Sequence, residues 1–215
     1  MFEIIPGILE KDFAEIERKI ELVKGFAKTI HIDVLDGKFA PNVTFLDPKP
    51  FTKYTLPSSG QALFFEVHLM VEEPINYLDS FAAAGFKRFL GQVEKMSSQE
   101  DFVAKGEFLG EVGLALDVNT PLESLKADYQ DLDCILVMSV KAGFSAQEFM
   151  PGSLEKVKKI REKSQISIEV DGGINEATIT QALNCNANRF VTTSFLFSGN
   201  PLANYQKLFS MTHQL

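Results

Sequence analysis

Eight short hydrophobic runs of strand length recur along the chain, each separated from the next by room for a crossover. They cover residues 3–6, 29–36, 63–70, 88–94, 112–118, 134–141, 166–171 and 189–195. Most are nearly continuous apolar stretches, as in Cys134-Ile135-Leu136-Val137-Met138. This pattern is typical of strands covered on both faces, as in a parallel sheet, and parallel strands need crossovers that are usually helices.

Helical patterns lie between these runs. The first has an N-terminal Asp12 with Glu15 in capping-box spacing, and its apolar stripe consists of Phe13, Ile16, Ile20, Val23 and Phe26. Further helices are predicted to begin near Pro74, Ser98, Pro121, Gln147, Asn175 and Pro201. The segment 47–59 has room for only a short helix, because it contains Pro48, Pro50 and Pro57.

Eightfold alternation of strand and helix without a low-complexity linker predicts an α/β fold, a single (β/α)8 TIM barrel. An open doubly wound sheet is the structural alternative. The chain has 215 residues, 45% of them hydrophobic, which favours one domain spanning residues 1–215.

Composition restricts the partners. A net charge of -8 disfavours binding to nucleic acid or to an anionic membrane surface. No apolar run approaches the roughly 20 residues that span a bilayer, and the first residues lack signal-peptide features, so we expect a soluble, cytoplasmic protein. Cys134 and Cys185 have no CxxC partner, which favours reduced, structural thiols.

In such a barrel the chemistry lies at the carboxyl ends of the strands. His31 and Asp33 are two residues apart in one predicted strand and therefore share a face. His68 lies near the end of the third strand and Asp171 ends the seventh. If these four side chains meet at the barrel mouth, they form a site suited to one divalent ion, Zn2+, Fe2+, Co2+ or Mn2+. We assign no role to His213, in the last residues of the chain.

The segment Ile30-His31-Ile32-Asp33-Val34-Leu35-Asp36-Gly37, followed by Phe39, Pro41-Asn42 and Thr44, resembles the second-strand signature of the ribulose-phosphate 3-epimerase family. Further similarity follows in family order at residues 67–71, 84–85, 94, 120–121, 137–140, 143–144, 147, 149 and 170–174. The resemblance covers nearly the whole chain. It implies a TIM barrel of the ribulose-phosphate-binding type.

The resemblance also implies a reaction. His31, Asp33, His68 and Asp171 would hold one divalent metal, and Asp33 and Asp171 would act as the acid and base. The expected reaction is C3 epimerisation of D-ribulose 5-phosphate to D-xylulose 5-phosphate through a cis-enediolate, in the pentose phosphate pathway. Family members are commonly homo-oligomers, and the expected partner is a small sugar phosphate.

The remaining expectations concern the substrate. Met70 and Met138 would cap the intermediate, although core filling explains them equally well. The residues expected to bind the substrate, mainly its phosphate, are His68, Gly143, Phe144, Ser145, Ala146, Gly172, Gly173, Thr193 and Ser194.

The chain departs from the family pattern at several of these places. Gly7 replaces a serine, Thr193 replaces a glycine, Ser145-Ala146 replace a glycine pair, Ala142 replaces a proline, and Gln92 replaces a histidine. None of these changes touches the four predicted metal ligands. We therefore expect proton transfer to be kept while the choice of substrate has drifted.

The sequence leaves two other functions open and disfavours a third. One is epimerisation of another ketose phosphate, such as allulose 6-phosphate, and another is a non-catalytic metal-binding barrel. A third, the decarboxylase and hexulose-phosphate synthase class, has an Asp-x-Lys-x-x-Asp signature. It is disfavoured because Asp33-Val34-Leu35-Asp36 contains no lysine.

Overall fold

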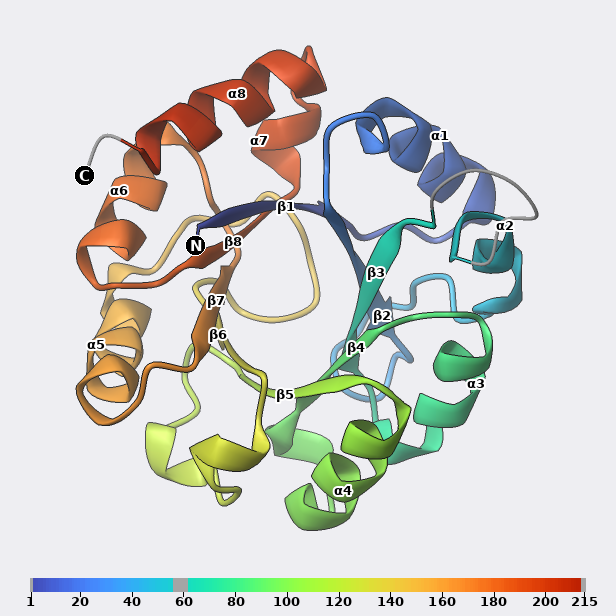
Figure 1. Cartoon of the computed structure of the whole chain (residues 1–215), viewed down its shortest axis with the longest axis vertical. Helices are drawn as coiled ribbons and strands as arrows, with labels where there is room; N and C mark the ends of the chain where they lie inside the picture. Colours follow the sequence, from blue (N-terminus) through green and yellow to red (C-terminus); the bar gives the residue numbers. More distant parts are fainter. Residues whose placement is uncertain (1, 56–61, 214–215) are drawn as a thin grey trace.

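Eight parallel strands close into a barrel in sequence order, with the helices outside it (Figure 1). The structure is a computed structural model that describes residues 2–55 and 62–213. The strands are β1 (Glu3–Ile8), β2 (Thr29–Leu35), β3 (Phe64–Met70), β4 (Arg88–Gln92), β5 (Glu111–Leu116), β6 (Cys134–Met138), β7 (Ser167–Asp171) and β8 (Arg189–Thr192). Pairing of β1 with β8 closes the ring, which confirms the TIM barrel and excludes the open sheet.

The α-helices are α1 (Phe13–Val23), α2 (Thr52–Thr55), α3 (Leu78–Ala83), α4 (Gln99–Leu109), α5 (Leu154–Lys163), α6 (Glu176–Asn184), α7 (Ser194–Phe197) and α8 (Pro201–Met211). The predicted helix starts at Asp12, Ser98, Asn175 and Pro201 are confirmed. Asp12 caps α1, but the Glu15 side chain bonds to Arg18 and does not complete a capping box.

Two helix predictions were wrong. The described residues between β5 and β6 contain only the 3-10 turns η4 (Leu122–Ser124) and η5 (Tyr129–Asp131), so no α-helix follows Pro121. The chain is extended at Leu125, and Asp128 caps the second turn instead of continuing a helix. The helix expected near Gln147 begins only at Leu154, because Gln147 bonds to the carbonyls of the preceding loop.

The other predicted element boundaries differ less from those in the structure. The segment 47–59 forms η1 (Lys49–Phe51) and α2, as its prolines predict, and residues 56–59 lie outside the described part. The helix expected near Pro74 is split into η2 (Pro74–Asn76) and α3. Strands β4 and β8 end before their apolar runs do, because the runs continue into η3 (Val93–Lys95) and α7.

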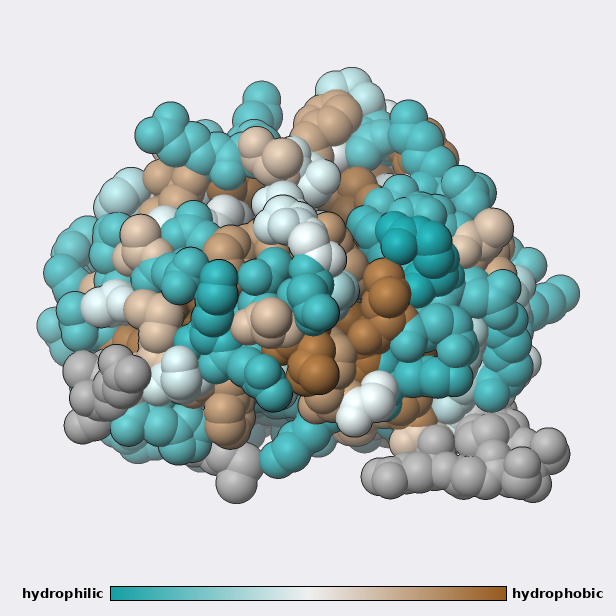
Figure 2. Space-filling model, turned by 90° about the horizontal axis from the view of Figure 1, so that it is seen from above, coloured by the Kyte–Doolittle hydropathy of each residue, from teal (hydrophilic) through white to brown (hydrophobic). Residues whose placement is uncertain are grey.

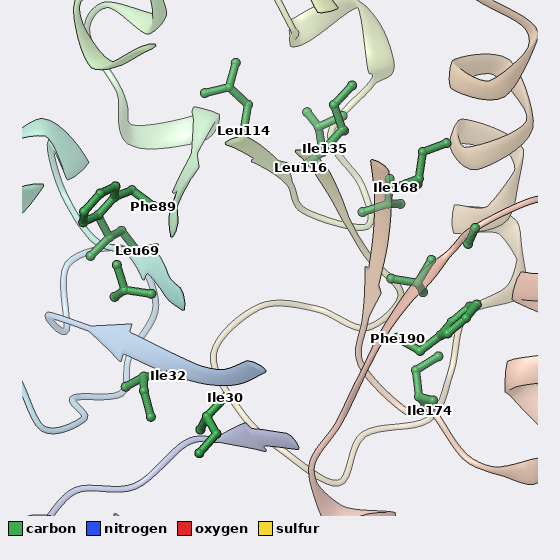
Figure 3. Packing of buried hydrophobic residues seen from close by; sticks show 14 of the residues in the cluster. Ile30, Ile32, Leu69, Phe89, Leu114, Leu116, Ile135, Ile168, Ile174 and Phe190 are labelled. Atoms are coloured by element: carbon green, nitrogen blue, oxygen red, sulfur yellow. The ribbon is translucent and has the colours of Figure 1, made fainter. Parts of the chain in front are cut away.

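Alternation along the strands produces two separate apolar layers. Outward side chains such as Ile30, Ile32 and Phe190 join the large cluster between the strands and the helices (Figure 3). Inward side chains from β4 to β6, including Leu90 and Leu136, form a second, smaller cluster inside the barrel. The inward positions of β2 are instead His31, Asp33 and Leu35, so the barrel interior has one apolar side and one polar side.

A buried ion network fills the polar side. The guanidinium of Arg189 contacts Glu3, Glu66 and Glu169, with the Nη2 to Glu66 Oε2 distance at 2.7 Å and the Nε to Glu169 Oε2 distance at 2.8 Å. Arg88 also contacts Glu66, at 2.6 Å. The side chains of Glu66 and Glu169 are fully buried. These ion pairs connect β1, β3, β4, β7 and β8 across the interior.

The outer surface is mostly hydrophilic on the face shown in Figure 2, with scattered apolar side chains. Within the described ranges, every helix is too short or too polar to cross a bilayer. Cys134 and Cys185 are both free and buried, as expected for structural thiols.

We predict that Asn175→Ala lowers the free energy of unfolding by about 1 kcal/mol, as expected for a lost N-cap. The Asn175 side chain accepts from Ala177 N and Thr178 N, and Thr178 Oγ1 accepts from Asn175 N in a complete capping box. Urea unfolding measures the loss. Asn175→Asp, which keeps the acceptor, is the control, and an equal loss in both variants would contradict the capping argument.

Candidate active site

The four predicted ligands meet at the carboxyl end of the barrel. Each of His31, Asp33, His68 and Asp171 offers a donor atom within 4.8 Å of the others, and all four residues are buried. Asp33 is central: its Oδ1 lies 3.3 Å from His31 Nε2 and 3.0 Å from His68 Nδ1. Asp171 Oδ2 lies 3.7 Å from His68 Nδ1. The prediction that these side chains converge therefore agrees with the fold.

His31 is oriented from behind by the ion network. Its Nδ1 lies 2.8 Å from Glu66 Oε1 and 3.3 Å from Glu169 Oε1. Burial raises the pKa of Glu66, but the charges of Arg189 and His31 outweigh it and hold that pKa well below its usual range. An ionised Glu66 can only accept a hydrogen bond, so His31 Nδ1 donates to it. His31 Nε2 then faces Asp33 and the other two predicted ligands.

His68 is oriented in the same manner. With the Gln92 amide oxygen facing it, His68 Nε2 donates to that oxygen at 3.1 Å. The Gln92 nitrogen then donates to Ala115 O at 3.1 Å and to Glu94 Oε2 at 2.7 Å. Nδ1 of His68 is left facing Asp33 Oδ1, 3.0 Å away. Partners behind each ligating imidazole are typical of metal sites, so the donor set fits a divalent cation.

The two carboxyls differ in acidity. Burial raises the pKa of Asp33, but the charges and hydrogen bonds of His31 and His68 outweigh it and hold that pKa well below the usual range. Burial raises the pKa of Asp171 far above its usual value, and the nearby charge of Asp33 raises it further. These shifts favour an ionised Asp33 and a protonated Asp171 in one cavity, the difference that an acid and base pair requires.

A small cleft opens above these carboxyls. Asp33, Asp171 and both methionines line it, together with all the predicted phosphate-binding positions, Gly143, Phe144, Ser145, Ala146, Gly172, Gly173, Thr193 and Ser194. His31 and His68 are fully buried. The structure thus brings the cleft-lining positions together around one opening, whereas His68, which was also predicted to bind the substrate, does not line it.

The loops after β6 and β7 depend on glycine. Gly172 has φ +112°, and a Cβ there would come within 2.5 Å of Val140 Cγ2. Gly143 has φ +122°, and Asn42 Nδ2 donates to its carbonyl at 2.8 Å. Ala146 has φ +59°, although it carries a side chain. The loop after β6 therefore keeps a left-handed conformation at a position where the family has glycine.

Met70 and Met138 end β3 and β6 on the inward face. Each is buried in the inner apolar cluster, and each lines the cleft. The two interpretations of these residues are therefore compatible, because one side chain fills the core and bounds the cleft. His213 is exposed near the chain end, where its Nδ1 lies 3.1 Å from Phe209 O.

The residues that contact the four predicted ligands from the barrel interior were not predicted from the sequence. Glu66 precedes His68 by two residues, and Glu169 precedes Asp171 by two, so each pair shares an inward face. The alternation that paired His31 with Asp33 could have found them. Arg189 carries no such local signal.

The match of the whole chain to known sequences decides the family. Residues 3–197 match the Ribulose-phosphate 3 epimerase family. The chain belongs to this family. Ribulose-phosphate 3-epimerase of Schizosaccharomyces pombe is 34% identical over 198 residues, covering 91% of this chain and 86% of the relative. That of Bacillus subtilis is 34% identical over 205 residues, covering 92% and 93%. This epimerase-family chain is therefore an isomerase, which disfavours the non-catalytic barrel.

Solved structures outside the family share its fold. The 3-hexulose-6-phosphate synthase of Salmonella typhimurium superposes with a TM-score of 0.74 at 12% identity, covering 99% of both chains. The 3-keto-L-gulonate-6-phosphate decarboxylase of Vibrio cholerae gives 0.72 at 11%, covering 98% and 97%. At these identities the likeness concerns the barrel alone, and this family member lacks the lysine expected for that class between Asp33 and Asp36.

Proposed function

We propose that this protein epimerises C3 of a ketose phosphate, converting D-ribulose 5-phosphate to D-xylulose 5-phosphate. The observation that carries the proposal is the pair Asp33 and Asp171, two buried carboxyls that line one cleft and whose pKa values shift in opposite directions. Epimerisation beside a ketone removes a proton from one face of a carbon and returns one to the other, which requires this difference.

One divalent cation completes the proposed site, held by His31, Asp33, His68 and Asp171. When bound, it supplies Lewis acidity that stabilises negative charge on the ketone oxygen. Two imidazole nitrogens and two carboxyl oxygens accept Zn2+, Fe2+, Co2+ or Mn2+ alike. The orientation of both imidazoles supports this set, because each is held through its other nitrogen.

The proton transfers follow from the two protonation states. Ionised Asp33 accepts the C3 proton, which leaves a cis-enediolate, and protonated Asp171 donates to the opposite face of the same carbon. The product then faces a protonated Asp33 and an ionised Asp171, so the roles exchange in the reverse direction. Met70 and Met138 exclude bulk water from the intermediate.

The phosphate is assigned to the loops around the cleft mouth. Backbone N–H groups of Gly172, Gly173, Thr193 and Ser194 bind it from one side, and the loop 143–146 binds it from another. The open cleft at these positions supports the assignment. The altered side chains in that loop favour testing a second ketose phosphate, allulose 6-phosphate, beside the first.

Family membership alone supports the wider setting that we propose. Residues 1–215 act as one catalytic domain, assembled as a homo-oligomer in the cytoplasm and serving the pentose phosphate pathway. The measured molecular mass in solution tests the assembly.

The decisive experiment follows exchange of the C3 proton of ribulose 5-phosphate with deuterium by NMR. We expect the wild-type protein to exchange it, to lose at least about tenfold in rate after chelation, and to recover with added Zn2+, Fe2+, Co2+ or Mn2+. Elemental analysis identifies the bound ion. Exchange that survives complete removal of metal contradicts the cation, and no exchange with either ketose phosphate contradicts the epimerase.

A further inference from the structure

Gly7 and Thr193 occupy one space at the mouth of the barrel. Gly7 lies on the inward face of β1, between Glu3, which contacts Arg189, and Leu9, which lines the cleft. A Cβ on Gly7 would lie 2.5 Å from Thr193 Oγ1 and 2.7 Å from Val191 Cγ1. Real Cβ atoms do not approach other atoms so closely. The Thr193 side chain therefore stands where a side chain at residue 7 would begin.

The Thr193 hydroxyl is available to a ligand. Thr193 precedes α7, but its side chain makes no capping hydrogen bond. It lines the cleft and is partly exposed there. Within the described ranges its Oγ1 has no hydrogen bond to protein. A hydroxyl both donates and accepts, so this one can either donate a hydrogen bond to a sugar hydroxyl or accept one from it.

Its position is next to the reacting groups. Val191, which packs in the same space, is the ladder neighbour of Asp171. Gly7 is the ladder neighbour of His31. The hydroxyl thus lies between two strand pairs: β1 beside β2, which carries His31, and β8 beside β7, which carries Asp171. This favours contact with the sugar chain over contact with the phosphate.

The two residues also depart from the family pattern in opposite directions. Serine is replaced by Gly7, and glycine is replaced by Thr193, so a hydroxyl is lost from β1 and gained beside it from β8. We propose that Thr193 Oγ1 binds a hydroxyl group of the ketose chain beside the reacting carbon, and that Gly7 is required to make room for it. This inference rests on the proposed function and names a specificity-determining residue within it.

Binding measured without turnover tests the hydroxyl. In an Asp171→Asn background, with metal occupancy matched among the variants by elemental analysis, we expect Thr193→Val to weaken the Kd for D-ribulose 5-phosphate about tenfold, the effect of one lost hydrogen bond. Thr193→Ser should recover most of that loss. Inorganic phosphate should bind all three proteins equally. Equal affinity of Thr193→Val and its parent for the sugar phosphate overturns the proposal, as does a matching loss for inorganic phosphate.

An exchange of the two residues tests the shared space without any ligand. Gly7→Ser should lower the midpoint of thermal unfolding by about 3–10 °C through overpacking, and the double variant Gly7→Ser with Thr193→Gly should recover the part of that loss caused by Thr193. An unchanged midpoint in Gly7→Ser, or no recovery in the double variant, overturns the pairing. Because neither readout requires epimerisation, failure here is distinct from failure of the C3 exchange assay, which concerns the proposed function alone.

Discussion

Asp171→Asn is expected to lower the rate of C3 proton exchange about 10³-fold, in the range that a positioned general acid or base contributes. Asparagine has nearly the same shape but can neither donate an acidic proton nor accept the substrate's. Burial raises the pKa of Asp171 and favours its protonated form, which the neutral amide matches in charge. Deuterium exchange of ribulose 5-phosphate, followed by NMR, gives the rate.

The matched control is Asp79→Asn, the same chemical change on α3, where exposed Asp79 pairs with half-buried Lys105 outside the cleft. That variant should exchange at the wild-type rate. Metal content and the unfolding midpoint of Asp171→Asn separate loss of proton transfer from loss of the site. Near wild-type exchange in a folded, metal-loaded Asp171→Asn protein would rule out the two-aspartate mechanism.

Arg189→Met is expected to lower the free energy of unfolding by about 3–5 kcal/mol, the cost of breaking a buried ion pair by removing one partner. Burial lowers the pKa of Arg189, but Glu66 and Glu169 raise it above its usual value, so the guanidinium is charged and compensates both. Methionine fills similar volume and leaves Glu3 and Glu169 without their cation. Urea unfolding measures the change.

For comparison, Lys105→Met removes a cation from the exposed pair with Asp79 and should cost about 0.5 kcal/mol or less. A comparable loss in both variants would show that burial of Arg189 does not increase its contribution to the free energy of unfolding. A loss in Arg189→Met that vanishes on also replacing Glu66 and Glu169 by glutamine would support charge compensation over packing.

The fold was largely predictable because each strand carries a local signal. A run such as residues 134–138 is apolar on both faces, and caps at Asp12, Ser98 and Asn175 mark helix starts within a few residues. The crossover after β5 was not predictable in this way. Its apolar residues Leu122 and Leu125 cover the core without a helix, a choice made by tertiary packing.

The site was predictable where its residues share a strand or a family motif. His31 with Asp33 follows from alternation, and the positions of His68 and Asp171 follow from strand ends. The spatial pairing of Gly7 with Thr193 could not be predicted, because it joins residues at opposite ends of the chain. Ring closure alone brings them together.

The same closure has a consequence for biosynthesis. Glu3 is translated 186 residues before its cation Arg189. Until Arg189 is translated, Glu3 on β1 and Glu169 on β7 have no guanidinium to pair with. If these carboxylates were buried before Arg189 is translated, their negative charge would have no compensating cation. The barrel is therefore expected to form as one event after translation of β8.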